Sequence, residues 1–273
     1  DRSTKEAGDI LLGASYRKEE DKIDGGFAGV FAQITDTYFQ RYGDQTKYLS
    51  KIAAKNHKNG AVNPYAHMQV DLGFDFCNKV SEKNPLVAPP LKRSDCSMIS
   101  DGAAALIIAD DELALEAEKA ISFKARVQMN DLMPLSKRDK TEFRGAALSW
   151  KKALSDAKVN LMDLSFVETH DCFTIAELIE YEAMGLTQRG EGYKVLEEGT
   201  VYKDGKLPIN PSGGLKAKGH PVGATGVSQH VMACMQLVGE AKDMQIKDAS
   251  LGGIFNMGGS AVANYVSILE RKS

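Results

Sequence analysis

The sequence predicts an α/β fold, and two observations support this prediction. Short apolar runs of the kind found in buried strands occur at residues 164–167 and 251–255. Segments in which apolar residues recur at every third or fourth position alternate with such runs and indicate helices. Polar residues and glycines follow both runs directly, so we expect chemically useful groups where strands end.

The first part of the chain, from about residue 20 to residue 90, is predicted to be mostly helical. Its clearest helical pattern comprises Phe27, Val30, Phe31, Ile34 and Tyr38. A stretch that contains proline and asparagine follows and reaches His67. We interpret the whole as a helical covering segment, with His67 as a loop or interface residue rather than a ligand.

The chain is then expected to return to a sheet at residues 95–125. Residues 95–101 form a polar turn, and the continuous apolar run that follows, up to Ile108, is typical of a fully buried strand. From Leu135 onward a helical pattern opens a second half of the chain. Its apolar positions are Phe143, Ala146, Ala147, Trp150 and Leu154.

The stretch 210–226 gathers five glycines and two prolines around His220. Glycine lets the backbone adopt conformations closed to other residues and lets a ligand approach the main chain. The helical pattern that follows predicts a helix whose unpaired N-terminal amides favour negative charge. Its apolar positions are Val227, Val231, Met235 and Val238. A histidine fixed there can act as an acid or a base, and the alternative is a structural histidine in a glycine-rich loop.

His170 and Cys172 follow the apolar run at 164–167 and precede another helical pattern, which ends near Gly185. Side chains at the carboxyl ends of strands face the ligand crevice in open α/β sheets. The two residues are therefore candidates for a site. The alternative is a buried cysteine that packs as a small apolar residue beside a hydrogen-bonded histidine.

A hairpin is predicted at the C-terminus, where residues 251–255 lead into Asn256-Met-Gly258-Gly-Ser260 and out along a strand at 261–269. The two glycines suggest a tight turn. Inward-pointing amides of such a turn can hold an oxyanion.

Composition agrees with a soluble enzyme, since the 273 residues are 43% hydrophobic and carry a net charge of −3. The mixed charges give no case for nucleic acid or membrane binding, and no apolar run reaches the ~18 residues of a membrane span. The four cysteines form no Cys-x-x-Cys pair, so we expect neither structural zinc nor a disulfide framework. Cytoplasm is the expected location.

Four separated motifs together resemble the thiolase superfamily, in the family's order along essentially the whole chain. They are Ser-Asp-Gly-Ala-Ala-Ala at 100–105, His-Asp-Cys-Phe at 170–173, the glycine-rich stretch with Gly-His-Pro at 210–226, and Asn-Met-Gly-Gly at 256–259. The His-Asp-Cys-Phe variant resembles the sterol-carrier-protein-2 type of thiolase.

The resemblance implies a thiolase-like layered αβαβα fold with two similar halves and a helical covering loop domain. Residues 1–94 would hold the remainder of the first half and the loop domain over coenzyme A (CoA). Residues 95–134 would form the return strand and helix of the first half, and residues 135–273 the C-terminal half.

The resemblance also implies roles for individual residues. His220 would activate a nucleophilic cysteine, Cys172 would be the acid/base group, and His170 would help to form an oxyanion hole. Asn256 and Gly258 occupy the position of the family's Cys-x-Gly turn, with the Gly258 amide contributing to the second hole. The residues expected to contact CoA are Ser97, Ser212, Gly213 and Lys218.

One departure from the family is the nucleophile, which should lie in a Cys-x-Ser turn N-terminal to these motifs and has no counterpart in this sequence. Cys96 begins Cys-Ser-Met and belongs to the Ser-Asp-Gly segment, so it is not a displaced nucleophile. The chain start, Asp1-Arg-Ser, resembles a point after the first half's central strand. We therefore expect a preceding polypeptide, removed or present as another chain, and the alternative is a shortened, inactive paralogue.

The predicted function is a thiolase-type acyltransferase that cleaves 3-ketoacyl-CoA with CoA, or condenses acyl-CoAs, through a cysteine acyl-enzyme. The alternatives are an incomplete acyl-CoA-binding subunit, or a subunit of a retro-aldol lyase that works with a small acyl-CoA-binding partner. CoA or acyl-CoA is the expected substrate, with no permanent cofactor and no metal. The family's assemblies imply a homodimer or homotetramer.

Overall fold

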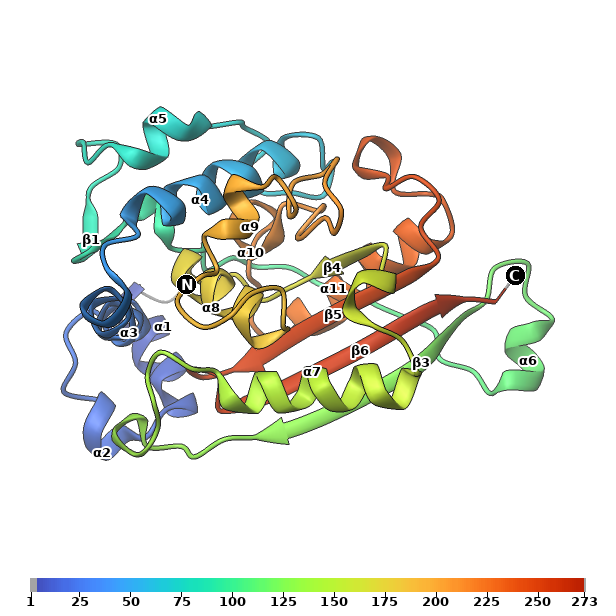
Figure 1. Ribbon diagram of the computed structural model, residues 1–273, viewed down its shortest axis with the longest axis horizontal. Coiled ribbons are helices and arrows are strands. Elements are labelled where there is room, and N and C mark those ends of the chain that lie inside the picture. Colours follow the sequence, from blue (N-terminus) through green and yellow to red (C-terminus); the bar gives the residue numbers. More distant parts are fainter. Residues whose placement is uncertain (1–3, 273) are drawn as a thin grey trace.

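A computed structural model describes residues 4–272, so the Asp1-Arg-Ser start lies outside the described residues, as does residue 273. A four-stranded sheet in the order β3-β6-β5-β4 forms the centre (Figure 1). Its strands are β3 (Ile121–Asn130), β4 (Phe166–Glu168), β5 (Leu251–Gly258) and β6 (Ala263–Arg271). β4 runs parallel to β5, whereas β6 is antiparallel to both β5 and β3. The predicted α/β fold is confirmed.

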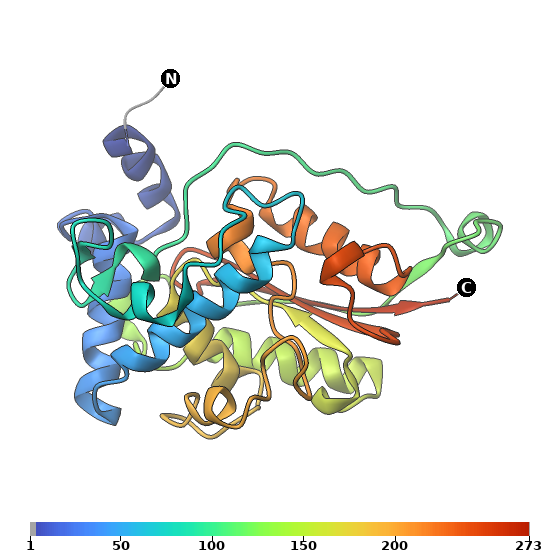
Figure 2. The same ribbon diagram turned by 90° about the horizontal axis from the view of Figure 1, so that it is seen from above.

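Helices cover both faces of this sheet because apolar side chains alternate along its strands. One buried set packs with residues of α11 (Thr225–Leu237): Phe166, Ile254 and Leu269. The neighbouring residues belong to the large core on the other face, which includes Trp150 of α7 (Arg144–Ala157): Val167, Phe255 and Ile268. Figure 2 shows α7 and α11 on opposite sides of the sheet.

The helical covering segment is confirmed. It contains α3 (Phe27–Tyr42), α4 (Thr46–Ala61) and α5 (Gly73–Asn78). Four of the five apolar positions predicted for the first helix are fully buried: Val30, Phe31, Ile34 and Tyr38. α8 (Thr174–Ala183) packs against both α3 and α4, so the covering segment and the sheet share one core.

Shorter elements complete the described chain. The helices are α1 (Thr4–Leu11), α2 (Arg17–Glu20), α6 (Asp111–Leu115), α9 (Lys194–Glu197) and α10 (Gly214–Lys218). The strands β1 (Leu86–Ala88) and β2 (Leu91–Lys92) form a separate two-stranded sheet. Within residues 4–272, every helix falls short of the length and apolarity needed to cross a membrane.

The predicted buried strand up to Ile108 is wrong. Residues 101–110 have no regular secondary structure and form a long arch away from the body of the molecule (Figure 2). Ile107 is 99% exposed and Ile108 79% exposed. An apolar run becomes a buried strand only where neighbouring strands pair with its backbone, and none of the described strands pairs with this one. The sheet expected from residue 95 begins instead at β3, whose partner β6 ends the chain.

The remaining helices described above and the C-terminal hairpin agree with the structure, with one shift. The helices predicted after Cys172, after Leu135 and after the glycine-rich stretch are α8, α7 and α11. The C-terminal hairpin is present, but Asn256 and Gly258 lie within β5, and the turn follows them. Gly259 and Ala261 carry its positive φ angles, of 62° and 61°.

Candidate active site

Five predicted catalytic residues line one cavity of about 1530 Å³, together with Ser97. They come from three separate parts of the chain: His170, Cys172, His220, Asn256 and Gly258. Residues of the covering segment close the other side, from α1 and α3 to α5. The cavity therefore lies where the carboxyl end of β4, the glycine-rich stretch and β5 meet the helical layer.

Backbone pairing explains why these segments converge. β4 ends at Glu168, and Asn210 N donates to Val167 O over 2.8 Å, so the glycine-rich stretch begins beside the end of that strand. Ser97 N donates to Cys172 O over 2.9 Å on the other side. Ile99 and His220 form an isolated parallel bridge. The histidine and cysteine loops are thereby held in register with each other.

The His220 ring is oriented by Thr225, at the first turn of α11. Its Nδ1 lies 2.7 Å from Thr225 Oγ1, whose hydroxyl donates to Pro221 O over 3.2 Å. Because that hydroxyl has one proton, Nδ1 is the donor to Oγ1 and Nε2 carries the lone pair. Burial lowers the pKa of His220 to about 3, helped by His170 and Lys218. His220 is thus a neutral imidazole with Nε2 available as a base.

His170 faces His220 with the two rings edge to face and their centroids 5.0 Å apart. Its Nδ1 lies 2.6 Å from Asn256 Oδ1 on β5, so Nδ1 donates and Nε2 again carries a lone pair. Burial lowers the pKa of His170 to about 4, although the bond to Asn256 opposes the shift. A neutral His170 can accept a hydrogen bond from a water molecule and so direct that water's other hydrogen at an oxyanion.

Cys172 is buried, with 6% of its surface exposed. Burial raises the pKa of its thiol well above the ordinary value, and the carboxyl groups of Glu180 and Asp171 add to the shift. The sulfur is therefore protonated at neutral pH. A protonated thiol suits a proton donor, whereas a nucleophile reacts as thiolate.

The remaining predicted CoA contacts lie outside the lining of this cavity, among the described residues. The Ser212 amide and hydroxyl both donate to the Glu168 carboxylate, over 3.0 and 2.7 Å. Gly213 approaches helix α4, where an added Cβ would lie 2.5 Å from Gly60 Cα. Lys218 is 6% exposed, and its Nζ donates to Ser228 Oγ over 2.8 Å. Their contact with CoA stays a prediction.

The sequence analysis missed several polar residues that line the cavity. His57 of α4 is 1% exposed, its Nδ1 has no hydrogen-bond partner among the described residues, and burial lowers its pKa to about 3. Lys216 is 3% exposed, and its Nζ donates to Cys96 O. Lys83 and Arg93 are exposed cations in the same lining. No motif marked His57, Lys83 or Arg93, because only the packing of the covering segment brings them to the cavity, whereas Lys216 belongs to the glycine-rich stretch.

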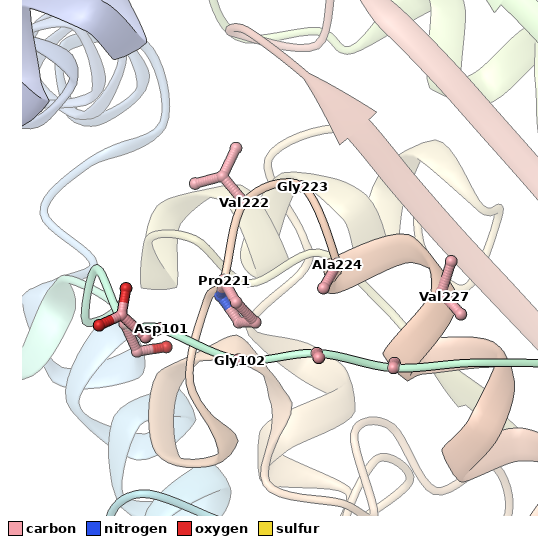
Figure 3. Close-up of a pocket in the computed structure, with 10 residues that line it drawn as sticks. Asp101, Gly102, Pro221, Val222, Gly223, Ala224 and Val227 are labelled. Atoms are coloured by element: carbon pink, nitrogen blue, oxygen red, sulfur yellow. The ribbon is translucent and has the colours of Figure 1, made fainter.

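A second, smaller cavity of about 430 Å³ lies next to the first motif. Residues 100–104 cross the loop that follows His220, and Gly102 passes beside Pro221 (Figure 3). An added Cβ on Gly102 would lie 2.9 Å from Pro221 Cγ. His67 is exposed, as expected of a loop residue, and its Nε2 lies 3.1 Å from Asp101 O.

Within the described part of the chain, we find no group of three or more histidine, cysteine, aspartate or glutamate side chains that could hold a metal ion. The polar lining of the cavity includes imidazole nitrogens, two thiols, side-chain amides, hydroxyls and cationic groups, besides the carboxylates of Asp9, Asp21 and Asp24. This donor set is suited to proton transfer and oxyanion stabilisation.

The fold and this cavity define an α/β protein with paired histidines and a thiol at the ends of its strands. The family described as "Thiolase C-terminal domain-like" matches residues 128–271. An acetyl-CoA acetyltransferase of Methanocaldococcus jannaschii is 34% identical over 98% of this chain and 69% of its own length. The chain belongs to the thiolase family.

Other relatives are similar over a smaller share of their length. The acetyl-CoA acetyltransferase of Methanothermobacter thermautotrophicus is 35% identical over 90% of this chain, and human sterol carrier protein 2 is 34% identical over 85%. The chain spans 63% and 43% of these two relatives, respectively.

Solved structures agree on the fold. A structure titled Ltp2-ChsH2(DUF35) aldolase has a TM-score of 0.79 at 20% identity, over 99% of this chain and 68% of its own. A monomeric SCP2-thiolase-like protein type 1 of Mycobacterium smegmatis has a TM-score of 0.72 at 17% identity, over 93% of this chain and 53% of its own. The predicted thiolase-like fold is confirmed.

Proposed function

We propose that this chain is the larger part of a sterol-carrier-protein-2-type thiolase, which cleaves 3-ketoacyl-CoA with CoA or condenses acyl-CoAs. The observation that carries the proposal is the single cavity that His170, Cys172 and His220 share, with two neutral imidazoles and a protonated thiol. Each of these protonation states matches one step of acyl transfer through cysteine.

In the first half-reaction, a nucleophilic cysteine from a polypeptide outside this sequence gives its proton to Nε2 of His220. The thiolate attacks the 3-keto carbon and forms a carbon–sulfur bond. Nε2–H then donates to the new oxyanion, with a water held by His170 as the second donor. Each such donor is worth roughly 3–4 kcal/mol to the transition state. Collapse of the intermediate breaks the Cα–Cβ bond, and the electron pair moves into the enolate of the departing acyl-CoA.

Cys172 then protonates the α-carbon of that enolate and becomes a thiolate, and the Gly258 amide would contribute to the second oxyanion hole. In the second half-reaction the thiol of incoming CoA returns a proton to Cys172. The CoA thiolate attacks the acyl-enzyme thioester, and the released cysteine recovers its proton from His220. Protons and electron pairs balance over the cycle without a metal.

CoA would enter from the side of the covering segment. Ser97 lines the cavity, and Lys83 and Arg93 are exposed cations on the same lining that suit its phosphates. Three other predicted CoA contacts are buried behind the cavity: Ser212, Gly213 and Lys218. Unless substrate binding moves them, they would maintain the conformation of the glycine-rich stretch rather than touch CoA. Cytoplasm is the compartment we propose.

The polypeptide that supplies the nucleophile would pair with residues 101–108. These residues offer an extended backbone and a row of exposed apolar side chains, among them Leu106, Ile107 and Ile108. Exposed segments of this kind are sites of strand addition and association.

We propose a homodimer or homotetramer for the complete protein. Light scattering at micromolar concentration tests this, and an active monomer would refute it.

A retro-aldol lyase subunit, or an acyl-CoA-binding subunit that lacks catalysis, is the second candidate. A retro-aldol step would use Cys172 or His220 as the acid/base group and needs no acyl-enzyme. The fold likeness to the Ltp2-ChsH2 structure is compatible with either candidate.

Intact mass and N-terminal sequencing of the natural protein separate the candidates, together with a thiolysis assay. A Cys-x-Ser segment upstream, or on a co-purifying chain, with CoA-dependent cleavage of a 3-ketoacyl-CoA supports the thiolase. A protein without that segment, which binds acyl-CoA and forms no acyl-enzyme, would contradict it.

A further inference from the structure

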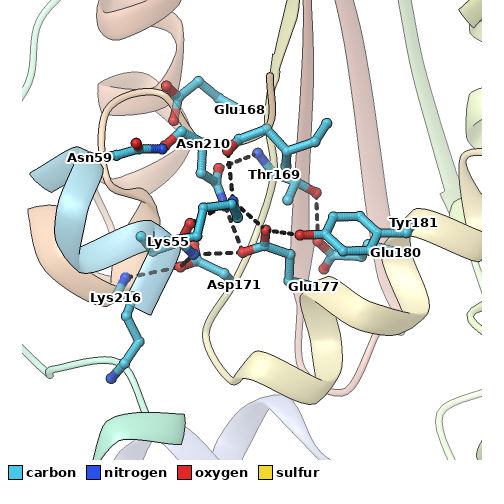
Figure 4. Close-up of polar contacts among 12 residues, drawn as sticks. Lys55, Asn59, Glu168, Thr169, Asp171, Glu177, Glu180, Tyr181, Asn210 and Lys216 are labelled. Carbon is cyan, nitrogen blue, oxygen red and sulfur yellow. Dashed lines mark hydrogen bonds and ion pairs between the residues drawn. The ribbon is translucent and has the colours of Figure 1, made fainter. Parts of the chain in front are cut away.

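A buried polar cluster lies directly behind the cavity and is centred on Lys55 of helix α4 (Figure 4). The Lys55 side chain is 1% exposed. Its Nζ lies 2.7 Å from Glu177 Oε1 and donates to Asn56 Oδ1 and Ile209 O, each over 2.7 Å. All three ammonium protons therefore have partners, as a buried cation requires.

Asn56 links this cluster to Asp171, the residue between His170 and Cys172. Its Nδ2 donates one proton to Asp171 Oδ2 over 2.7 Å and the other to Glu177 Oε2 over 2.6 Å. Both side-chain groups of Asn56 are thus used, because its Oδ1 accepts from Lys55. One amide bridges two carboxylates and the lysine.

Asp171 connects the end of β4 with the glycine-rich stretch. Its Oδ1 accepts from Leu215 N over 2.7 Å and its Oδ2 from Lys216 N over 3.2 Å. Gly214 permits this approach, since an added Cβ there would lie 2.4 Å from both carboxylate oxygens. The carboxylate therefore fixes the short helix α10, whose last residue, Lys218, is two residues before His220.

The charge balance of this cluster depends on Lys55. Asp171 and Glu177 are both fully buried, and Lys55 is the cation within ion-pair distance of Glu177. Other charged or titratable groups that face the two carboxylates are Tyr181, whose hydroxyl donates to Glu177, and the more distant Lys216, Lys218 and Glu180. Burial and the Glu177 carboxylate raise the pKa of Asp171 to about 7. Loss of one partner would leave an uncompensated buried charge.

We infer that Lys55 and Asn56 are positioning residues, which hold Asp171 and through it the backbone of the His170–Cys172 loop and the glycine-rich stretch in the reactive arrangement. The inference rests on the proposed function only for its catalytic consequence. Neither residue lines the cavity, so neither touches the substrate, and both act across the covering segment.

The experiment measures long-range ¹H–¹⁵N spectra of the histidine rings, because these spectra report tautomer and environment without needing turnover. The chain has five histidines. His230 serves as the internal reference, since it is not part of the cavity lining and its ring bonds to Gly226 O and Ser267 Oγ. The variants are Lys55→Met and Asn56→Ala. The control is Lys152→Met, which breaks an exposed lysine–aspartate pair of helix α7.

Lys55→Met and Asn56→Ala are expected to shift the His170 and His220 signals and to leave His230 in place, whereas Lys152→Met shifts none of the three. Lys55→Met combined with Glu177→Gln removes cation and anion together and should return the two signals toward their original positions. In a protein with measurable thiolysis, Lys55→Met should lower kcat at least tenfold with KM changed less than threefold.

If Lys55→Met does not fold, Asn56→Ala decides the matter, because it keeps the Lys55–Glu177 ion pair and removes the amide that links this pair to Asp171. Unchanged His170 and His220 signals in a folded Lys55→Met or Asn56→Ala protein would overturn the inference. A protein that shows these shifts but no thiolysis would leave the inference standing and would count against the proposed function instead.

Discussion

The Nδ1 atom of His220 lies 2.7 Å from the hydroxyl oxygen of Thr225, whose own proton is directed to the carbonyl oxygen of Pro221. This arrangement leaves a neutral ring, in the cavity lining, whose Nε2 carries the lone pair. The sequence places the two residues five positions apart, at the junction between the glycine-rich stretch and α11. The helix start therefore orients the base.

The first prediction concerns Thr225→Val, which keeps the shape of a residue that is 1% exposed but removes the acceptor of Nδ1–H. We expect kcat to fall about 10- to 100-fold, the usual effect of losing a partner that fixes a histidine tautomer. Steady-state thiolysis measures it. Thr37→Val is the control, since that hydroxyl bonds only to Gln33 O within α3. Equal activities of the two variants would show that Thr225 does not orient the base.

The second prediction concerns Gly214→Ala. Gly214 has φ of 60°, and an added Cβ would lie 2.4 Å from the Asp171 carboxylate. Gly239→Ala is the matched control, because Gly239 also has a positive φ, of 78°, but an added Cβ there meets nothing within 4 Å. We expect Gly214→Ala to lower the free energy of unfolding by about 1–3 kcal/mol more than the control does. Urea denaturation of both variants measures this difference. Equal losses of unfolding free energy would mean that the loop around Gly214 accommodates the added methyl group at no extra cost.

The third prediction concerns pH and the buried histidines. Burial lowers the pKa of His57 to about 3 and that of His170 to about 4, from an ordinary value of 6.5. Between the lowered pKa values and 6.5, these histidines bind more protons in the unfolded chain than in the folded one. Their contribution to the free energy of unfolding is therefore present above pH 6.5 and is lost as pH falls. Glu168 and Glu180, whose pKa values are raised by burial, act in the opposite sense.

A variant therefore isolates the histidine contribution. His57→Gln removes one proton that the unfolded chain binds and the folded chain does not. We therefore expect the slope of unfolding free energy against pH, between pH 6 and 4, to become shallower by about 1.4 kcal/mol per pH unit. Urea unfolding at a series of pH values measures the slopes. Parallel curves for His57→Gln and the original protein would show that His57 is protonated in the folded state.

The sequence could predict those parts of the fold in which a local pattern and its packing partner are both in this chain. α7, α8 and α11 have helical apolar patterns that pack on the sheet, and each was found where the pattern predicted it. The apolar run ending at Ile108 has an equally clear strand pattern. It is exposed because a buried strand needs a neighbouring strand to pair with its backbone, and a local sequence pattern does not show whether such a neighbour is present.

The candidate site divides in the same way. His170, Cys172, His220, Asn256 and Gly258 could be predicted because motifs at the ends of strands carry them, and the structure brings them to one cavity. Lys55, Asn56 and Glu177 lie inside helices that read as ordinary amphipathic segments. Their meeting with Asp171 depends on how α4 crosses α8 and α10, which only the tertiary packing determines.

The central claim is that Cys172 donates a proton to carbon while His220 activates a different cysteine. Cys172→Ala and His220→Ala in the complete protein should therefore fail at different steps. His220→Ala should abolish the acyl-enzyme, since the nucleophile loses its base. Cys172→Ala keeps the nucleophile and its base, so an acyl group should still load from a simple acyl-CoA.

The most direct measurement is mass spectrometry of the trapped acyl-enzyme beside a thiolysis assay of the Cys172→Ala protein. We expect an acyl adduct on the upstream cysteine and thiolysis slowed by ~10²–10⁴, the usual cost of removing a general acid or base. Near-normal thiolysis by Cys172→Ala would contradict the account. Cys172 would then be a packing residue, and the proton donor would lie elsewhere.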